Sequence, residues 1–175
     1  IKMLENHPDF NAGFGAALQA DGVPRLSASM MDSSDQIFSA VMNVEGIRHP
    51  SQLAAYLQTQ KHSILDAEGA QTLAASLEFK IENLVTEDRR KSWLEHKAKK
   101  TSGQTGTVGC VVHGLENTLI AVTSTGGVGN ETVGRLGDTP TIAGNYSTKL
   151  AAASFTGVGE KIIALGGAAK LCLLS

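Results

Sequence analysis

Residues 104–112, QTGTVGCVV, join a charged segment to a valine-rich run, and a glycine–threonine pair stands at the junction. A threonine hydroxyl is a poor nucleophile unless a base lies beside it. The nearest base is the threonine's own α-amino group, whose ordinary pKa is about 7.7–8.0. Thr107 has that group only after the Gly106–Thr107 bond is cut, and the glycine leaves the hydroxyl room to reach the peptide carbonyl. The pair is therefore a candidate self-cleavage site with Thr107 as the nucleophile.

A second pair of chemically capable side chains is Arg135 and Asp138 in GRLGD. A guanidinium fork and a carboxylate at this spacing can hold the carboxylate and the ammonium of one amino acid. An ordinary surface ion pair between the two is the alternative, and these two residues alone favour it. The preceding STGGVGNETVG has neither GxxxxGK[ST] nor GxGxxG, so tight turns are expected there rather than a nucleotide site.

Other kinds of site find little support in the sequence. The five histidines show no metal-ligand spacing, and no GxSxG elbow is present. Cys110 and Cys172 form no CxxC pair, so we expect no disulfide or zinc site and a reducing, cytoplasmic compartment. The net charge of -2 argues against a nucleic-acid partner. No apolar run reaches the ~18 residues of a membrane span, and no signal-peptide pattern opens the chain.

The hydrophobic periodicity predicts strands and helices that alternate along the chain, which indicates a layered α/β arrangement. Strands are expected at the end of the glycine-punctuated turn 10–18, after the Asp21–Gly22 hairpin signal, and within 25–31, 37–44, 107–112, 118–124 and 151–155. Helices are expected in 1–6, from Pro50, in the second half of 63–77, from the Thr86 cap to Lys100, and before Leu165. The basic run 89–100, in the helix that follows the Thr86 cap, contains Glu and is interpreted as a solvated face. Residues 101–106 are expected to form a flexible, exposed linker.

Six motifs, LENHPDFNAGFGAAL, SASMMD, GTVGCVV, TSTGG, GRLGDTP and TGVGE, follow one another across residues 3–160. In this order they resemble the plant-type asparaginases and isoaspartyl peptidases, which are N-terminal nucleophile hydrolases. The resemblance implies a four-layer αββα sandwich, incomplete at both termini, in one domain over 1–175. It also implies a self-cleaved precursor, with an α-subunit-like part (1–106, ending in the linker) and a β-subunit-like part (107–175).

The resemblance assigns roles to individual residues. Thr107 would be the nucleophile in self-cleavage and in hydrolysis, Thr125 the hydroxyl that activates it, and Asn11 a hydrogen-bonding residue that keeps it placed. Thr156 and Gly157 would donate to the oxyanion. Arg135 would bind the substrate's α-carboxylate and Asp138 its α-ammonium. The substrate-binding set is Arg135, Leu136, Gly137, Asp138, Thr156, Gly157, Val158 and Gly159. A structural monovalent cation, Na⁺ or K⁺, would bind the backbone carbonyls of Leu4, Glu5, His7, Phe10, Ala12 and Phe14.

The implied activity is hydrolysis of L-asparagine and β-aspartyl (isoaspartyl) dipeptides to L-aspartate, without a required cofactor, by a homodimer of cleaved precursors. Glycosylasparaginase activity is an alternative, although STGG rather than STNG, GTVG rather than DTIG and the unpaired cysteines favour the first. A truncated, non-catalytic relative with an intact Gly106–Thr107 bond is the third hypothesis.

The sequence departs from the family pattern at several points. The N-terminal HGG motif and the C-terminal strands are missing, and the segment between GRLGD and TGVGE is two residues shorter. Val158 replaces the His of TGHGE, while Ser27 and Ser33 replace the Asp and Gly of DASIMDG. We therefore expect exposed sheet edges, which favour association.

Overall fold

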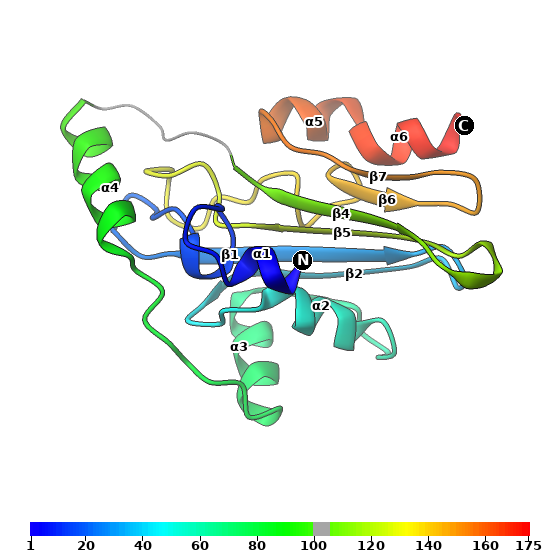
Figure 1. Ribbon diagram of the computed structural model, residues 1–175, viewed down its shortest axis with the longest axis horizontal. Coiled ribbons are helices and arrows are strands. Elements are labelled where there is room, and N and C mark those ends of the chain that lie inside the picture. Colours follow the sequence, from blue (N-terminus) through cyan, green and yellow to red (C-terminus); the bar gives the residue numbers. More distant parts are fainter. Residues whose placement is uncertain (100–105) are drawn as a thin grey trace.

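A computed structural model describes residues 1–99 and 106–175, so all of the predicted linker except Gly106 lies outside the described residues. The layers run helix, sheet, sheet, helix (Figure 1). Helices α2 (Pro50–Leu57) and α3 (Ala67–Ser76) cover one face of a five-stranded sheet. A two-stranded sheet covers its other face, and α6 (Gly167–Leu173) packs on that second sheet, next to α5 (Gly159–Leu165). The predicted αββα sandwich is confirmed.

The five-stranded sheet brings together the two halves of the sequence. Its strands are β1 (Arg25–Asp32), β2 (Ile37–Glu45), β3 (Ile64–Leu65), β4 (Val108–His113) and β5 (Leu119–Thr125). They lie in the order β3-β2-β1-β5-β4, antiparallel except between β2 and β3. Val108 at the start of β4 lies opposite Ser124 near the end of β5. This register places Thr107 beside Thr125.

The second sheet packs on the first through buried polar contacts. It consists of β6 (Asn145–Ser147) and β7 (Ala152–Ser154). The Asn145 amide donates to Ser29 Oγ at 3.0 Å and to the Ala121 carbonyl at 3.2 Å. Ser147 Oγ donates to the Met31 carbonyl at 3.0 Å. Hydrogen bonds therefore fix this interface, whereas apolar side chains such as Leu26, Val41 and Leu53 form the core under α2 and α3.

The structure corrects one expectation near the N-terminus. The predicted short strand at the end of 10–18 is wrong, whereas Asp21–Gly22 lies in a turn closed by the hydrogen bonds from Gly22 N to Gln19 O at 2.8 Å and from Gln19 N to Val23 O at 3.0 Å. Gly13–Gly15 forms a single 3₁₀ turn, and residues 16–19 are extended without joining a sheet. Two hydrogen bonds tie this stretch to a later loop: Asn130 N to Leu18 O at 2.7 Å and Ala20 N to Glu131 O at 2.8 Å. The segment pairs with a loop, so a backbone acceptor (Leu18 O) and a backbone donor (Ala20 N) are satisfied without a strand.

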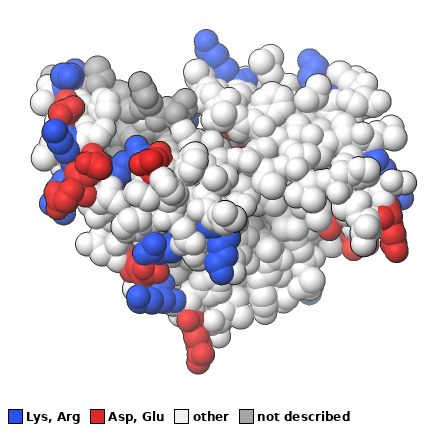
Figure 2. All heavy atoms as spheres, viewed as in Figure 1, with Lys and Arg blue, Asp and Glu red and all other residues white. Residues whose placement is uncertain are grey.

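Two helices lie at the periphery of the fold. Helix α1 (Lys2–Glu5) is a single turn, and α4 (Glu87–Lys99) has no buried residue. The Thr86 hydroxyl accepts from Arg89 N at 3.2 Å, which confirms the predicted cap. Figure 2 shows basic and acidic side chains intermixed on the side where α4 lies, as expected for a solvated helix. Among the described residues, no helix is both long and apolar enough to cross a membrane.

Candidate active site

The hydroxyl groups of Thr107 and Thr125 lie 2.9 Å apart, within hydrogen-bonding distance. Thr107 directly precedes β4, and Thr125 is the last residue of β5. The Gly127 backbone N–H donates to Thr125 Oγ1 at 3.1 Å. This donor occupies an acceptor position of Thr125 and favours pointing the Thr125 hydrogen toward Thr107. The arrangement can stabilise negative charge that develops on Thr107 Oγ1.

Asn11 is buried beside the candidate cleavage site, but its hydrogen bonds go to the surrounding loops. Its side-chain amide donates to the Gly127 carbonyl at 2.5 Å, and its Oδ1 accepts from Ala17 N at 2.7 Å. Its backbone carbonyl accepts from Gly126 N at 3.0 Å. A Cβ placed on Gly106 would lie 3.0 Å from Asn11 Cβ. The residue thus packs against Gly106 and fixes the turn that holds Thr125.

Arg135 and Asp138 line one cavity together with Thr107, Thr125 and Gly157. They form no ion pair with each other, because Arg135 Nε pairs with Glu160 Oε1 at 2.7 Å. This hydrogen bond raises the pKa of Arg135. Asp138 is buried, its Oδ2 has no hydrogen-bond partner among the described residues, and burial raises its pKa. The surface ion pair between Arg135 and Asp138 is therefore wrong, and both groups face the cavity.

The other residues of the expected binding set lie at different positions around this cavity. Gly137 and Gly157 line it, and Gly159 is packed against Asp138, where an added Cβ would lie 2.9 Å from Asp138 Oδ1. Thr156 borders an adjoining hollow on the other side of Thr107, with Gly109 and Ser154. Leu136 and Val158 are exposed and line neither space.

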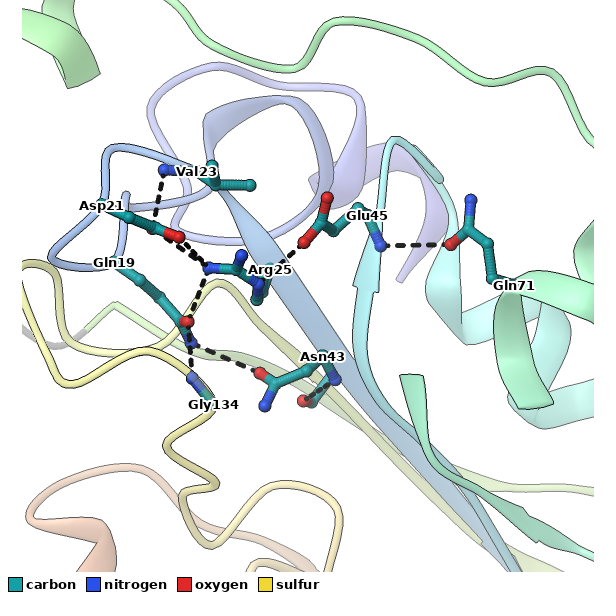
Figure 3. Close-up of polar contacts among 9 residues, drawn as sticks. Gln19, Asp21, Val23, Arg25, Asn43, Glu45, Gln71 and Gly134 are labelled. Atoms are coloured by element: carbon teal, nitrogen blue, oxygen red, sulfur yellow. Dashed lines mark hydrogen bonds and ion pairs between the residues drawn. The ribbon is translucent and has the colours of Figure 1, made fainter. Parts of the chain in front are cut away.

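A polar network that the sequence did not reveal forms another wall of the cavity. Arg25 donates to Gln19 Oε1 and Asp21 Oδ1, both at 3.0 Å, and pairs with Glu45 at 2.8 Å (Figure 3). The buried Gln19 also accepts from Gly134 N at 3.0 Å. Asn43, with a left-handed φ of 52°, donates its backbone N–H to Ser27 Oγ at 3.1 Å. The sequence feature that could have indicated this network is the polar Gln19 in AALQAD. The left-handed conformation of Asn43 within a strand indicates it only once the structure is known.

Glu131 is the second buried carboxylate of this cavity and was also missed. Neither of its oxygens has a hydrogen-bond partner among the described residues. Burial raises its pKa above the ordinary value for glutamate. The carboxylate lies against Gly127, since a Cβ at that position would collide with Glu131 Oε1. The same turn therefore contacts both Thr125 and Glu131.

Three carbonyls of the predicted cation-binding loop accept backbone hydrogen bonds. Leu4 O accepts from His7 N at 3.1 Å, His7 O from Phe10 N at 3.3 Å, and Ala12 O from Gly15 N at 3.2 Å. The Phe10 and Pro8 carbonyls converge on Gly15, and those of Glu5 and Arg48 converge on Gly13. The described residues contain no group of three or more His, Cys, Asp or Glu placed to hold a metal.

Comparison with known proteins places these observations in a family. The sequence model of the family described as asparaginase matches residues 1–174. An isoaspartyl peptidase/L-asparaginase of Synechocystis sp. is 42% identical, over 98% of this chain and 57% of its own length. The isoaspartyl peptidase/L-asparaginase of Rattus norvegicus is 39% identical, over 93% of this chain and 53% of its own. A plant-type L-asparaginase of Pyrococcus abyssi is 37% identical, over 94% and 60%. The chain thus spans little more than half the length of these relatives.

Proposed function

This chain belongs to the asparaginase family, and from that premise we propose that it is a self-cleaving threonine hydrolase. It cuts its own Gly106–Thr107 bond and then hydrolyses β-aspartyl dipeptides and L-asparagine to L-aspartate. The names of the Synechocystis and Rattus relatives support this substrate class. The observation that carries the proposal is the 2.9 Å contact between the Thr107 and Thr125 hydroxyls, in the cavity that Arg135 and Asp138 also line.

The hydrolytic cycle begins with the α-amino group of Thr107, which cleavage has released. This amine takes the hydroxyl proton, and Thr107 Oγ1 attacks the side-chain carbonyl of the aspartyl unit. An acyl-enzyme forms while ammonia or an amino acid leaves, and water then releases L-aspartate. The Thr125 hydroxyl, polarised by the Gly127 N–H, supports the developing charge on Thr107.

Two charged side chains on the cavity wall orient the substrate. Arg135 binds the α-carboxylate and Asp138 the α-ammonium, with Gly137 and Gly159 as the small residues that leave them space. Thr156 and Gly157 donate to the oxyanion, and Leu136 and Val158 complete the binding segments by their backbones. A donor aimed at an oxyanion typically contributes about 3–4 kcal/mol to lowering the barrier.

The division into an α-subunit-like part (1–106) and a β-subunit-like part (107–175) is compatible with one continuous core. Strand β5 of the second part pairs with β1 of the first over Ser27–Asp32 and Ile120–Thr125. The cleaved fragments therefore remain joined through the sheet. The carbonyl-rich loop around Gly13 and Gly15 fits a monovalent cation such as Na⁺ or K⁺, because hard cations prefer oxygen ligands.

The test is aspartate release by the protein after prolonged incubation, beside a Thr107→Ala variant. β-Aspartyl dipeptide, L-asparagine and glycosylated asparagine are supplied separately. We expect aspartate from the first two substrates with the wild-type chain and none with the variant. Release from glycosylated asparagine alone would favour glycosylasparaginase activity. A folded wild-type chain that releases aspartate from none of the three would contradict the proposal.

A further inference from the structure

Self-cleavage at Gly106–Thr107, on which this inference rests, has a requirement that hydrolysis lacks. Before cleavage the nitrogen of Thr107 belongs to a peptide bond, so its lone pair is delocalised and cannot accept the hydroxyl proton. Another group must take the proton from Thr107 Oγ1 in this first step. A suitable acceptor lies within reach of the hydroxyl, directly or through one water, and is deprotonated at the working pH.

Glu131 lines the cavity that contains the Thr107 hydroxyl. Its side chain is 8% exposed, and both of its oxygens lack a hydrogen-bond partner among the described residues. It lines the same cavity as Thr107 and Thr125 and lies against Gly127, whose N–H donates to Thr125. The cavity volume is about 20 Å³, which is room for about one water. A water in this space would have the threonine hydroxyls and the Glu131 carboxylate among the polar groups that line it.

The two arginines of the cavity are paired with other carboxylates. Arg25 is paired with Asp21 and Glu45, and Arg135 with Glu160. Asp138, the other buried carboxylate of the cavity, is packed against Gly159 and lies near Arg135, whereas Gly127 has no Asp138 atom among its near contacts.

Helix α4 adds two titratable groups on the outer side of the loop that carries Glu131. Arg89 and His96 border the hollow beside Val128 and Gly129. Neither residue lines the cavity that contains Thr107. Among the carboxylates of the described cavity, Glu131 is thus the one packed on the turn that binds Thr125.

The geometry points to Glu131 as the proton acceptor for self-cleavage, acting on Thr107 through one water. Thr107 Oγ1 forms a bond to the carbonyl carbon of Gly106 as its proton passes through the water to the carboxylate. The C–N bond then breaks, and Glu131 returns the proton through the water to the nitrogen of Thr107. This leaves a free amine and an ester between Gly106 and Thr107 Oγ1. A second water hydrolyses the ester to the Gly106 carboxylate and the free hydroxyl.

The environment of Glu131 also makes it a stronger base than an exposed glutamate. Burial raises its pKa, opposed in part by its own backbone N–H, by the positive charge of Arg135 and by the nearby backbone N–H groups of Val128 and Gly129. Proton transfer is efficient when the pKa of the acceptor approaches the working pH. The active form is the deprotonated one, so the cleavage rate should rise with pH through this elevated pKa and then level off.

The experiment follows the first-order rate of cleavage by intact mass between pH 4 and pH 9 in three full chains: wild type, Glu131→Gln and Glu116→Gln. Glu116 is exposed in the β4–β5 hairpin and serves as the matched control. We expect Glu131→Gln to cleave at least about 10²-fold more slowly than the wild type, and its cleavage rate should not rise with pH in the acidic range. Glu116→Gln should cleave at the wild-type rate with the wild-type pH dependence. Hydroxylamine, which captures esters, should release fragments from the wild type earlier than water does.

The thermal midpoint of unfolding separates a folding defect in Glu131→Gln from the loss of a proton acceptor. Removal of an unpaired buried charge should leave the thermal midpoint at or above that of the wild type. Wild-type rate and pH profile in Glu131→Gln would overturn the inference while leaving the proposed function standing. If the rise of the cleavage rate with pH is lost in Asp138→Asn and kept in Glu131→Gln, the inference would also be overturned. An uncut chain in every variant, wild type included, would overturn both the inference and the self-cleavage it rests on.

Discussion

At the scale of single residues, Asp138 must be ionised to hold a substrate ammonium group. Burial raises its pKa above the ordinary value of about 3.9. We therefore expect kcat/KM for a β-aspartyl dipeptide to fall with decreasing pH earlier than an exposed aspartate would allow. Asp138→Asn removes the charge, and the KM should rise about 10²-fold, since a buried charge pair loses one member. Steady-state kinetics across the pH range measure both effects.

The control for this substitution is Asp35→Asn in the exposed turn between β1 and β2. It makes the same chemical change away from the cavity and should leave KM within twofold of the wild type. An unchanged KM in Asp138→Asn would show that the ammonium group is bound elsewhere.

The residues of the site differ in how far the sequence reveals them. Thr107, Thr125, Arg135, Asp138 and Gly157 occur in motifs, and the structure brings them together around one cavity. Glu131 stands in a glycine-rich loop where a glutamate is ordinarily solvated. Its burial follows from the tertiary packing of that loop on residues 18–20, which no local pattern encodes. Asn11 was expected to hydrogen-bond near the nucleophile, and its side chain bonds to Gly127, in the turn that contacts Thr125, and to Ala17.

At the scale of elements, the 3₁₀ turn Gly13–Gly15 positions Asn11 and the following extended segment. A Cβ on Gly15 would collide with the backbone carbonyls of Pro8 and Phe10, neither of which can rotate away. Gly15→Ala should lower the free energy of unfolding by about 1–3 kcal/mol, the usual effect of overpacking, as measured by urea denaturation. Gly114→Ala is the matched control, because its nearest contact would be 3.6 Å away. Equal stability of the two variants would contradict the tight turn.

The first turn of α2 contributes a pH-dependent term to stability through His49. Its Nδ1 lies 3.4 Å from the buried Glu5, and burial lowers the pKa of His49 although the Glu5 carboxylate opposes this. Below the unfolded-state pKa of about 6.5, the unfolded chain therefore binds more protons than the native one. The free energy of unfolding should fall as the pH drops through that value.

Urea denaturation between pH 7.5 and pH 5.5 isolates this contribution when the wild type is compared with His49→Gln. The difference between the two chains should shift in favour of the variant as the pH falls. His62→Gln, at an exposed position in the loop after α2, should parallel the wild type. A pH-independent difference between wild type and His49→Gln would contradict the inferred direction of the pKa shift.

Elements with hydrophobic periodicity were predictable, and those held by polar contacts were not. Strands β1, β2, β4 and β5 follow from runs of apolar and β-branched residues. Strand β6 has only three residues, and its buried side chains are the polar Asn145 and Ser147. Helix α6 follows Gly166, whose left-handed φ of 65° ends α5. The adjacent Gly166 and Gly167 indicate a turn in the sequence, so the helix that begins at Gly167 was not predicted.

At the scale of the whole molecule, β4 forms an edge of the five-stranded sheet as far as the described residues show. Val111 and Val112 on this strand are 49% and 45% exposed. An exposed apolar edge favours pairing with another chain, so we expect self-association that increases with concentration. Val112→Lys should reduce it in sedimentation velocity, because a charged side chain blocks edge pairing. Leu115→Lys places the same charge in the hairpin turn and should reduce self-association less. Equal reductions by the two variants would show that the added charge acts on solubility in general and not on pairing at the β4 edge.

The most direct test of the account is the intact mass of the purified full chain over several days, beside Thr107→Ala. We expect the wild type to divide into two fragments, one ending at Gly106 and one beginning at Thr107, while the variant stays whole. The fragments should remain associated through the β1–β5 pairing until the protein is denatured. A folded wild-type chain that keeps a single uncut mass, or cleavage at the same bond in Thr107→Ala, would contradict the assignment of Thr107 as the nucleophile.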